Sequence, residues 1–351
     1  MIVLSLFNGM NTGREALENV GIKVDKYYSS EIKPYAIKLT QHHFPDTIQV
    51  GDVTNWSEWY IEWQNIDLLL SGSPCQDLSQ AGKCAGIHGK KSSLFFVFIA
   101  IKNHINQERK KHGKSEVLFL QENVGSASRL DVGIMSRELG VYPVRINSSL
   151  VTAQLRDRYY WSNIRTKQDG MFGDLVTDIP QPKDKKIMLK DIIENGFVVK
   201  NKSNALMQSE SKTYAYKDME KFEKFIYKRI SEFRQICELV YQDENAYLKV
   251  KEATEKGFVD IANGECVDLS FPTSKTRRGR SMKEKSNCLL RTNEYYLFEN
   301  NELRYFTQTE IERLQGFTDG YTGILSRNQA SSLLGDGWTL PIIEHIFSFI
   351  Q

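Results

Sequence analysis

The chain has 351 residues, and 46 Lys and Arg against 44 Asp and Glu leave a formal net charge of +2 at pH 7. With 40% hydrophobic and 26% charged residues, the composition is that of a globular protein of about two domains, which excludes a largely disordered chain. The longest apolar run, Leu94 to Ile101, is much shorter than the roughly 20 residues that cross a bilayer, so no transmembrane helix is expected. No basic residue precedes the apolar start at Ile2, which favours a first strand over a secretory signal and predicts a cytoplasmic protein.

The five cysteines are scattered along the chain, without a Cys-x-x-Cys pair or a histidine pair at metal-ligand spacing. This distribution predicts neither a disulfide framework nor a zinc site, and no bound metal is expected. The near-neutral net charge leaves nucleic-acid binding open, because the distribution of charge over the surface decides such binding.

The first part of the chain alternates between predicted strands and helices. Apolar strands are expected at Ile2 to Phe7, Ile66 to Leu70 and Val117 to Leu120, and a further strand at Lys26 to Ser30. Helical character follows the first strand, from Arg14 to Val20. This alternation predicts an α/β fold with a mostly parallel sheet. Ligands bind outside the carboxyl ends of such strands, which is where polar residues of this region fall.

A glycine-bearing turn is expected between the first strand and the first helix. Gly9 and Gly13 would let the backbone approach a ligand closely, and Glu31, after the second strand, would accept hydrogen bonds from ribose hydroxyls. Asn11 stands where a dinucleotide-binding motif has its second glycine, so an ordinary strand-to-helix turn is the alternative. Asp52 would either accept from an adenine amino group or cap a helix.

A thiol, a carboxylate and two cations are expected at adjoining strand ends. Cys75 follows one strand in a loop stiffened by Pro74, and Glu122 ends the neighbouring strand. Arg156 and Arg158 are two positions apart in an extended segment, so both guanidinium groups can face one site. A lone cysteine is more often a core residue, but this combination suits attack by a thiolate with proton donation by the acid.

The pattern changes between about Lys183 and Asn301, where the alternation of strands and helices ends. A charged, aromatic-rich stretch from Ser211 to Tyr241 predicts a packed pair of helices, and an arginine-rich irregular segment follows at residues 276–280. We expect this region to form a second domain. A final helix is expected from Ile342 to Phe349.

Taken in order, these motifs resemble those of the DNA (cytosine-5)-methyltransferases. The resemblance covers residues 1–165 and 304–351 and rests on spaced segments, namely Leu6-Phe7-Asn8-Gly9 with Gly13, Ser30-Glu31, Gly51-Asp52-Val53, Gly72-Ser73-Pro74-Cys75-Gln76-Asp77-Leu78-Ser79, Glu122-Asn123-Val124, Gln154-x-Arg156-x-Arg158-Tyr159, Arg313-Leu314-Gln315-Gly316-Phe317 and Gly335-x-Gly337-Trp338. The Trp338 segment is most similar to the animal de novo enzymes, whereas Pro74-Cys75-Gln76 follows the bacterial and phage form.

The resemblance implies a Rossmann-like, S-adenosylmethionine-dependent methyltransferase fold with a second, smaller target-recognition domain. The catalytic domain would comprise residues 1–182 and 302–351, and the target-recognition domain residues 183–301. In the first pocket Phe7 would stack on the adenine, Glu31 would hold the ribose, and the Trp338 loop would close over the cofactor. The implied cofactor-binding residues are Phe7, Asn8, Gly9, Met10, Thr12, Glu31, Ile32, Asp52, Val53, Asp336, Gly337 and Trp338.

The resemblance also implies a mechanism. Cys75 would add to C6 of a flipped-out cytosine, which makes C5 nucleophilic, while a protonated Glu122 bonds to N3. Arg158, supported by Arg156, would orient the base or a neighbouring phosphate. The implied activity is transfer of a methyl group to cytosine C5 in a specific double-stranded DNA sequence, by a bacterial or phage modification enzyme of the restriction-modification type.

The expected DNA-binding surface takes basic residues from two segments, namely Lys83, Lys90, Lys91, Arg277, Arg278 and Arg280. An ordinary solvated charged face is the alternative. We expect a monomer, or else a dimer, associated with the nucleoid of a bacterial or phage-infected cell. Two other functions stay open: a tRNA cytosine-5 methyltransferase, disfavoured because the Cys-Phe-Thr segment of that branch is missing, and a catalytically silent DNA-binding regulator, disfavoured by the intact Cys75 and Glu122.

Overall fold

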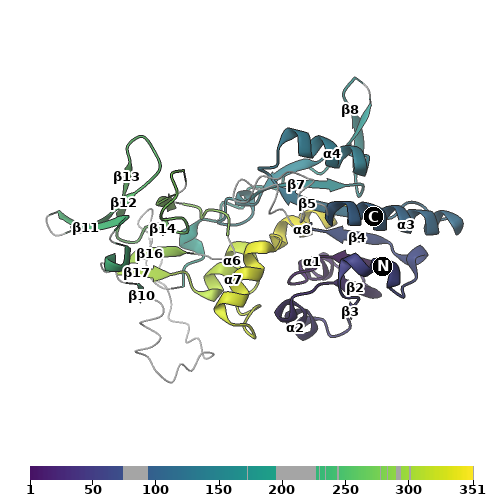
Figure 1. The fold of residues 1–351 in the computed structure, drawn as a ribbon, viewed down its shortest axis with the longest axis horizontal. Coiled ribbons are helices and arrows are strands. Elements are labelled where there is room, and N and C mark those ends of the chain that lie inside the picture. Colours follow the sequence, from purple (N-terminus) through teal and green to yellow (C-terminus); the bar gives the residue numbers. More distant parts are fainter. Residues whose placement is uncertain are drawn as a thin grey trace.

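The computed structural model describes residues 1–73, 94–171, 173–194, 227–228, 230–233, 235–242, 245–276, 278–282, 284–289, 294–299 and 302–350. Within these ranges the chain forms one large sheet with helices on both faces, and smaller sheets at one end of the molecule (Figure 1). Among the described helices, none is long and apolar enough to cross a lipid bilayer.

The large sheet confirms the predicted α/β fold. Its seven strands lie in the order β3 (Ile48–Gln49), β2 (Lys26–Ser30), β1 (Ile2–Leu6), β4 (Leu68–Ser71), β5 (Leu118–Val124), β7 (Asp157–Ser162) and β6 (Val144–Asn147). Strands β3 to β5 are parallel along this order, whereas β7 runs antiparallel to both of its neighbours. The amino end of β7 therefore lies beside the carboxyl end of β5.

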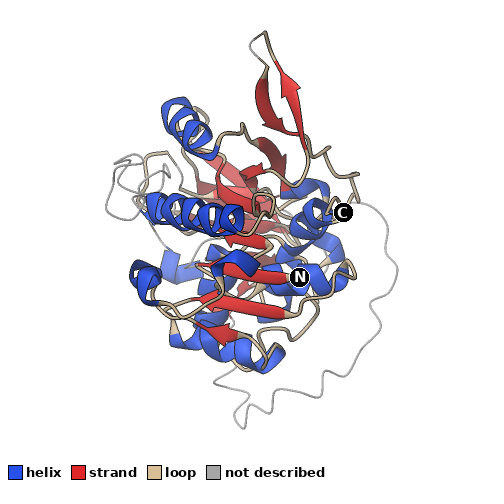
Figure 2. Cartoon of the chain, turned by 90° about the vertical axis from the view of Figure 1, so that its right-hand side faces the viewer, coloured by secondary structure: helices blue, strands red, loops and turns tan. Residues whose placement is uncertain are grey.

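Helices cover both faces of this sheet (Figure 2). Alternate strand residues point to opposite faces, so Val3 contributes to one buried cluster and Leu4 to another. The first cluster includes side chains of α1 (Thr12–Asn19), α2 (Pro34–His43) and α8 (Leu340–Phe347). The second includes side chains of α3 (Leu94–Lys111) and α4 (Arg129–Leu139). Short 3-10 turns at Val53–Glu58, Trp63–Asn65 and Ser148–Leu150 connect these elements.

The second region is built mainly from antiparallel strands. One sheet has the order β10 (Tyr227–Lys228), β17 (Glu302–Tyr305), β16 (Tyr295–Glu299), β14 (Cys266–Asp268) and β15 (Arg280–Met282). Another contains β11 (Cys237–Gln242), β12 (Asn245–Lys251) and β13 (Phe258–Ala262). A separate hairpin, β8 (Thr166–Asp169) and β9 (Asp174–Thr177), projects from the large sheet (Figure 1). Further 3-10 turns lie at Leu189–Asp191 and Ile230–Phe233.

The helical prediction for Ser211 to Tyr241 is wrong where the structure describes this stretch. Residues 227–228 and 237–241 are strands, and only a 3-10 turn at Ile230–Phe233 is helical. Pairing explains the difference, because β11 pairs along its whole length with β12, from Cys237 opposite Val250 to Gln242 opposite Asn245. Cross-strand contacts of this kind override the weak helical preference of mixed charged residues.

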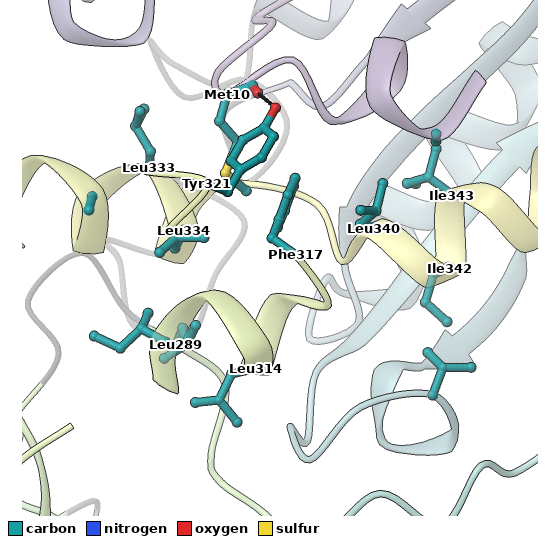
Figure 3. Close-up of a cluster of buried hydrophobic side chains, with 14 of the residues drawn as sticks. Met10, Leu289, Leu314, Phe317, Tyr321, Leu333, Leu334, Leu340, Ile342 and Ile343 are labelled. Atoms are coloured by element: carbon teal, nitrogen blue, oxygen red, sulfur yellow. Dashed lines mark hydrogen bonds between the residues drawn. The ribbon is translucent and has the colours of Figure 1, made fainter. Parts of the chain in front are cut away.

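Helices α6 (Gln308–Gln315) and α7 (Arg327–Asp336) lie between the two regions (Figure 1). They share a buried cluster with both: Leu289 of the second region packs in the same core as Leu314 of α6 and Leu334 of α7 (Figure 3). The expected domain boundary at residue 302 falls at the start of β17, which pairs with β16 of the second sheet. We therefore propose that the second domain extends to Tyr305.

Candidate functional site

A cavity of about 510 Å³ opens at the carboxyl ends of β1 and β4. These strands are neighbours, but the chain continues from β1 toward β2 on one side and from β4 toward β5 on the other. Such a switch point leaves a crevice that helices do not cover, and ligands of α/β proteins bind there. The cavity joins the predicted cofactor residues to Glu122, Arg156 and Arg158, which also line it.

The loop between β1 and α1 has an unusual backbone conformation. Phe7 and Asn11 have φ angles of 55° and 66°, and Gly9 has 59°. Positive φ costs free energy for residues with a Cβ, so the surrounding structure must hold this loop in place. One such contact is a hydrogen bond from the backbone N–H of Gly9 to Glu31 Oε2, at 2.8 Å. The loop and the end of β2 therefore form one rigid wall of the cavity.

Glu31 is the centre of this wall. Its Oε1 accepts the backbone N–H groups of Ile32 (2.8 Å) and Lys33 (2.9 Å), in addition to the Gly9 bond at Oε2. Each carboxylate oxygen has more than one acceptor position, so Glu31 can still accept hydrogen bonds from a ligand. The contacts fix the carboxylate at the mouth of the cavity, where the sequence predicted a partner for ribose hydroxyls.

The other predicted cofactor residues fall into two groups. Most line the cavity, namely Phe7, Asn8, Gly9, Thr12, Glu31, Ile32, Asp52, Val53, Asp336, Gly337 and Trp338. Met10 instead lies in the core beneath it, fully buried, with its carbonyl oxygen accepting from Tyr321 Oη at 3.0 Å (Figure 3). Asp52 also caps the 3-10 turn that begins at Val53, since its Oδ1 accepts from the backbone N–H of Thr54 at 2.8 Å. Asp52 therefore caps the turn, as the alternative prediction had it, and also lines the cavity.

Glu122 lies at the inner end of the cavity, held from two sides. Arg158 Nε is 2.8 Å from Glu122 Oε1, and the side chains are only 13% and 10% exposed. Trp338 Nε1 donates to the other oxygen, Oε2, at 3.2 Å. Because β7 is antiparallel to β5, with Arg158 opposite Val124, the guanidinium group reaches the carboxylate two residues earlier. The sequence prediction that the acid and an arginine share one site agrees with this arrangement.

Arg156 makes a different set of contacts from Arg158. Its Nη1 donates to the carbonyl of Gly335 at 3.1 Å and its Nη2 to the carbonyl of Gly337 at 2.7 Å. Arg156 is buried, and it therefore fixes the loop that carries Trp338. The two arginines line one cavity as predicted, but one holds the carboxylate and the other holds the loop.

Gly72 at the end of β4 provides the space for the Trp338 ring. A Cβ atom at this position would lie 2.7 Å from Trp338 Nε1 and 3.5 Å from Glu122 Oε2. Real Cβ atoms do not approach other atoms as closely as 2.7 Å, so only glycine allows the indole to lie against the strand end. The next residue, Ser73, accepts from Gln121 Nε2 at 2.9 Å, which ties the ends of β4 and β5 together.

Several predicted site residues lie outside the described residues, namely Cys75, Lys83, Lys90, Lys91 and Arg277. Two others make contacts within the second region. Arg280 pairs with Asp268, whose side chain is 1% exposed, and Arg278 Nε donates to the carbonyl of Glu252 at 3.3 Å. Their role in binding DNA stays a prediction. Among the described residues, no group of His, Cys, Asp and Glu side chains is arranged to hold a metal ion.

The structure adds contacts that the sequence did not predict. Lys33 Nζ pairs with Asp336 Oδ2 at 2.8 Å, and both residues line the cavity, so this ion pair joins α2 to α7 across it. Cys288, from the second region, contacts both Arg156 and Arg158. Neither could have been found from a motif, because each depends on a tertiary contact between segments far apart in the chain.

Comparison with solved structures identifies the fold. The structure of the methyltransferase EhMeth from Entamoeba histolytica matches with a TM-score of 0.58 and 15% sequence identity, covering 100% of this chain and 97% of that one. The architecture, with its cavity at the switch point of a mostly parallel sheet, is therefore a methyltransferase fold. At this level of identity the match establishes the fold alone.

The chain belongs to the C-5 cytosine-specific DNA methylase family, whose model matches residues 1–351. It is 30% identical over 206 residues to the orphan methyltransferase M.SPRI of Bacillus phage SPR, a match that covers 55% of this chain and 42% of the relative. It is 26% identical over 354 residues to the type II methyltransferase M1.ScrFI of Lactococcus lactis subsp. cremoris, covering 98% of this chain and 76% of the relative. The chain thus spans less than half the length of the phage relative. The family resemblance predicted from the motifs is confirmed.

Proposed function

We propose that the protein transfers a methyl group from S-adenosylmethionine to C5 of a flipped-out cytosine in double-stranded DNA, through a covalent bond between Cys75 and C6. The observation that carries this proposal is that one cavity is lined both by Glu31 and by Glu122 and Arg158. Membership of a family of C-5 cytosine-specific DNA methylases supports the substrate. Similarity to a phage and a type II methyltransferase supports a bacterial or phage modification enzyme. We propose that it works on DNA in the cytoplasm as a monomer.

The cavity has the donors and acceptors that a nucleoside-bearing cofactor requires. Glu31 presents a carboxylate fixed by backbone bonds, and Asp52 presents a second one on the same wall. Phe7 and Trp338 supply aromatic surface, and the β1–α1 loop contains no lysine, which suits a cofactor without phosphates. S-adenosylmethionine, when bound, supplies an electrophilic methyl group on a sulfonium. The residues present fit this group.

The residues at the inner end suit activation of a cytosine. Addition of a thiolate at C6 of the ring moves electron density to C5 and builds negative charge at N3, and a proton from Glu122 at N3 would neutralise that charge. A protonated carboxyl oxygen can donate its own proton and still accept a hydrogen bond, so Trp338 and Arg158 can keep the acid in place during this step. After methyl transfer, water takes up the C5 proton, N3 returns its proton to Glu122, and Cys75 leaves as the thiolate, which restores the aromatic ring.

The target base is not accessible inside a duplex, so the cytosine must be turned out of the helix at a cost of a few kcal/mol. The second region adjoins the cavity arginines through Cys288, which supports a role for this region in contacting the DNA during this step. We therefore propose that residues 183–305 recognise the target sequence, with Arg278 and Arg280 among the contacts.

A direct test is transfer of radiolabelled methyl groups from S-adenosylmethionine to duplex DNA and, separately, to tRNA. We expect label in the DNA with the wild-type protein. The variant Cys75→Ala should transfer none and should bind S-adenosylmethionine as tightly as the wild type, by calorimetry. Label in tRNA alone would favour an RNA methyltransferase, and an inactive wild-type protein that binds DNA would favour a silent regulator.

A further inference from the structure

The thiol of Cys288 contacts both cavity arginines. Cys288 lies between β15 and β16, in the second region, and its Sγ is 3.1 Å from Arg156 Nη1 and 3.4 Å from Arg158 Nη2. In both contacts, an N–H group of a guanidinium cation donates to the sulfur. A thiol sulfur accepts weakly, whereas a thiolate accepts such bonds much more strongly.

The segment that carries Cys288 is fixed to the catalytic domain by its backbone. Ser286 donates to the carbonyl of Ala153 and accepts from the N–H of Leu155, both at 2.7 Å. Gln154 Oε1 accepts from the backbone N–H of the residue after Cys288, at 3.0 Å. Because residues 153–155 lead directly into β7, these hydrogen bonds fix the position of the thiol relative to the two arginines.

Cys288 closes a ring of contacts around the inner end of the cavity. Glu122 pairs with Arg158, and Arg158 contacts the sulfur. The sulfur in turn contacts Arg156, which holds the carbonyl preceding Trp338. The indole of Trp338 then donates back to Glu122. The ring joins β5, the segment that carries both arginines, the Trp338 loop and the second region, which contributes the thiol.

The electrostatic surroundings favour a charged sulfur. Burial raises the pKa of the Cys288 thiol, but the two guanidinium groups outweigh burial and leave the pKa below its ordinary value. On the other side, Tyr295 donates its hydroxyl hydrogen to the carbonyl of Cys288 at 2.5 Å, and burial raises the pKa of this tyrosine, so it stays neutral. Asp268 and Arg280, beyond Tyr295, form an ion pair in which the two charges offset each other.

We propose that Cys288 is a positioning residue, which fixes the two cavity arginines relative to each other and so connects the second region to the geometry of Glu122. The inference rests on the proposed function and deepens it. Movement of the 284–289 segment on target binding would change the contacts of Arg158, and through them the orientation of the acid. Binding of the target DNA by the second region would then affect catalysis through the contacts of Cys288 with the two arginines.

The first test compares substitutions at this thiol in the full-length protein. Cys288→Ala should lower kcat for methyl transfer about tenfold, as expected when a contact to a charged group is lost, and leave KM for S-adenosylmethionine within about twofold. Cys288→Ser should recover part of the loss, since a hydroxyl also accepts. The control is Cys237→Ala, because Cys237 is a buried thiol of the same region in a separate core cluster; it should lower the melting temperature without lowering kcat.

The second test needs no methyl transfer. The pH dependence of Cys288 alkylation by iodoacetamide, followed by mass spectrometry of its peptide, should show a midpoint that rises in Arg158→Gln and stays unchanged in Cys237→Ala. An unchanged midpoint in Arg158→Gln, a wild-type kcat in Cys288→Ala, or a loss that serine does not relieve would overturn the proposal. A midpoint that rises in Arg158→Gln, together with a wild-type protein that transfers no methyl group, would count against the proposed function alone.

Discussion

The hydrogen bond between Trp338 and Glu122 gives a specific prediction, because a substitution at Trp338 can remove its donor and keep an aromatic ring. Phenylalanine in place of Trp338 keeps an aromatic ring against Gly72 but lacks the Nε1–H that donates to Glu122 Oε2 at 3.2 Å. The side chain of Glu122 is only 10% exposed, so water cannot readily replace the lost donor. Trp338→Phe should therefore weaken the positioning of the acid more than it weakens cofactor binding.

The size of the effect follows from the geometry. A hydrogen bond to a charged or protonated carboxyl group is typically worth about 1.5–3 kcal/mol. The distance of 3.2 Å is at the long end of the normal range, and Arg158 still holds the other oxygen at 2.8 Å, so the lower value applies. About 1.5 kcal/mol corresponds to roughly a tenfold loss of kcat/KM for methyl transfer.

The assay is single-turnover transfer of labelled methyl groups to duplex DNA, together with the dissociation constant for S-adenosylmethionine by calorimetry. Trp63→Phe is the matched control, because Trp63 packs with Trp56, Trp59 and His104 away from the cavity. It should leave both measurements unchanged. Transfer by Trp338→Phe at the wild-type rate would refute the role of the indole N–H.

Three further predictions concern the cavity wall, the strand end and a half-buried histidine. Glu31→Ala should weaken S-adenosylmethionine binding by about 1.5–3 kcal/mol, measured by calorimetry, through lost hydrogen bonds to a carboxylate. Gly72→Ala should lower kcat/KM at least about tenfold, since the added Cβ lies 2.7 Å from Trp338 Nε1 and must displace the ring. Burial lowers the pKa of His43 below 6.5, although its bond to the Tyr321 carbonyl opposes this. The contribution of neutral His43 to stability is therefore present above pH 6.5 and lost as the pH falls through the lowered pKa. The free energy of unfolding, measured with urea, should thus fall between pH 7.5 and pH 5.5 in the wild type. It should fall less in His43→Gln, which has no titrating group at this position.

Each of these expectations has a contrary result. Unchanged cofactor affinity in Glu31→Ala would remove the ribose role of this residue. A fully active Gly72→Ala would mean that the Trp338 ring does not need to lie against the strand end. Equal pH dependence of unfolding in His43→Gln and the wild type would show that the partial burial of His43 does not affect its titration.

The sequence predicted the central sheet well because each of its early strands can be recognised from the residues within the strand itself. The predicted strand at Lys26 to Ser30 matches β2 at both ends, and the run from Ile66 to Leu70 overlaps β4. The apolar run of Leu68 to Leu70 in β4 is typical of a strand that is buried between two layers of helices. The pairing of Glu122 with an arginine was also predictable, since both residues stand at strand ends that carry polar motifs.

The parts that failed depend on partners distant in the chain. Arg156 binds backbone carbonyls of the Trp338 loop, and no side-chain motif indicates a carbonyl acceptor. The strands at 237–241 arise from pairing with β12, which the local composition does not reveal. Cys288 resembles an isolated core cysteine until the second region is placed against β7. Tertiary contacts of this kind decide which residues of a predicted site face one another.

The most direct test of the account is to sequence DNA for 5-methylcytosine after expression of the protein in a host that lacks cytosine-5 methylation. We predict 5-methylcytosine within one recurring duplex sequence in cells that express the wild-type protein, and none in cells that express Cys75→Ala at the same level. Unmodified cytosine in both samples, or equal methylation by the alanine variant, would contradict the account.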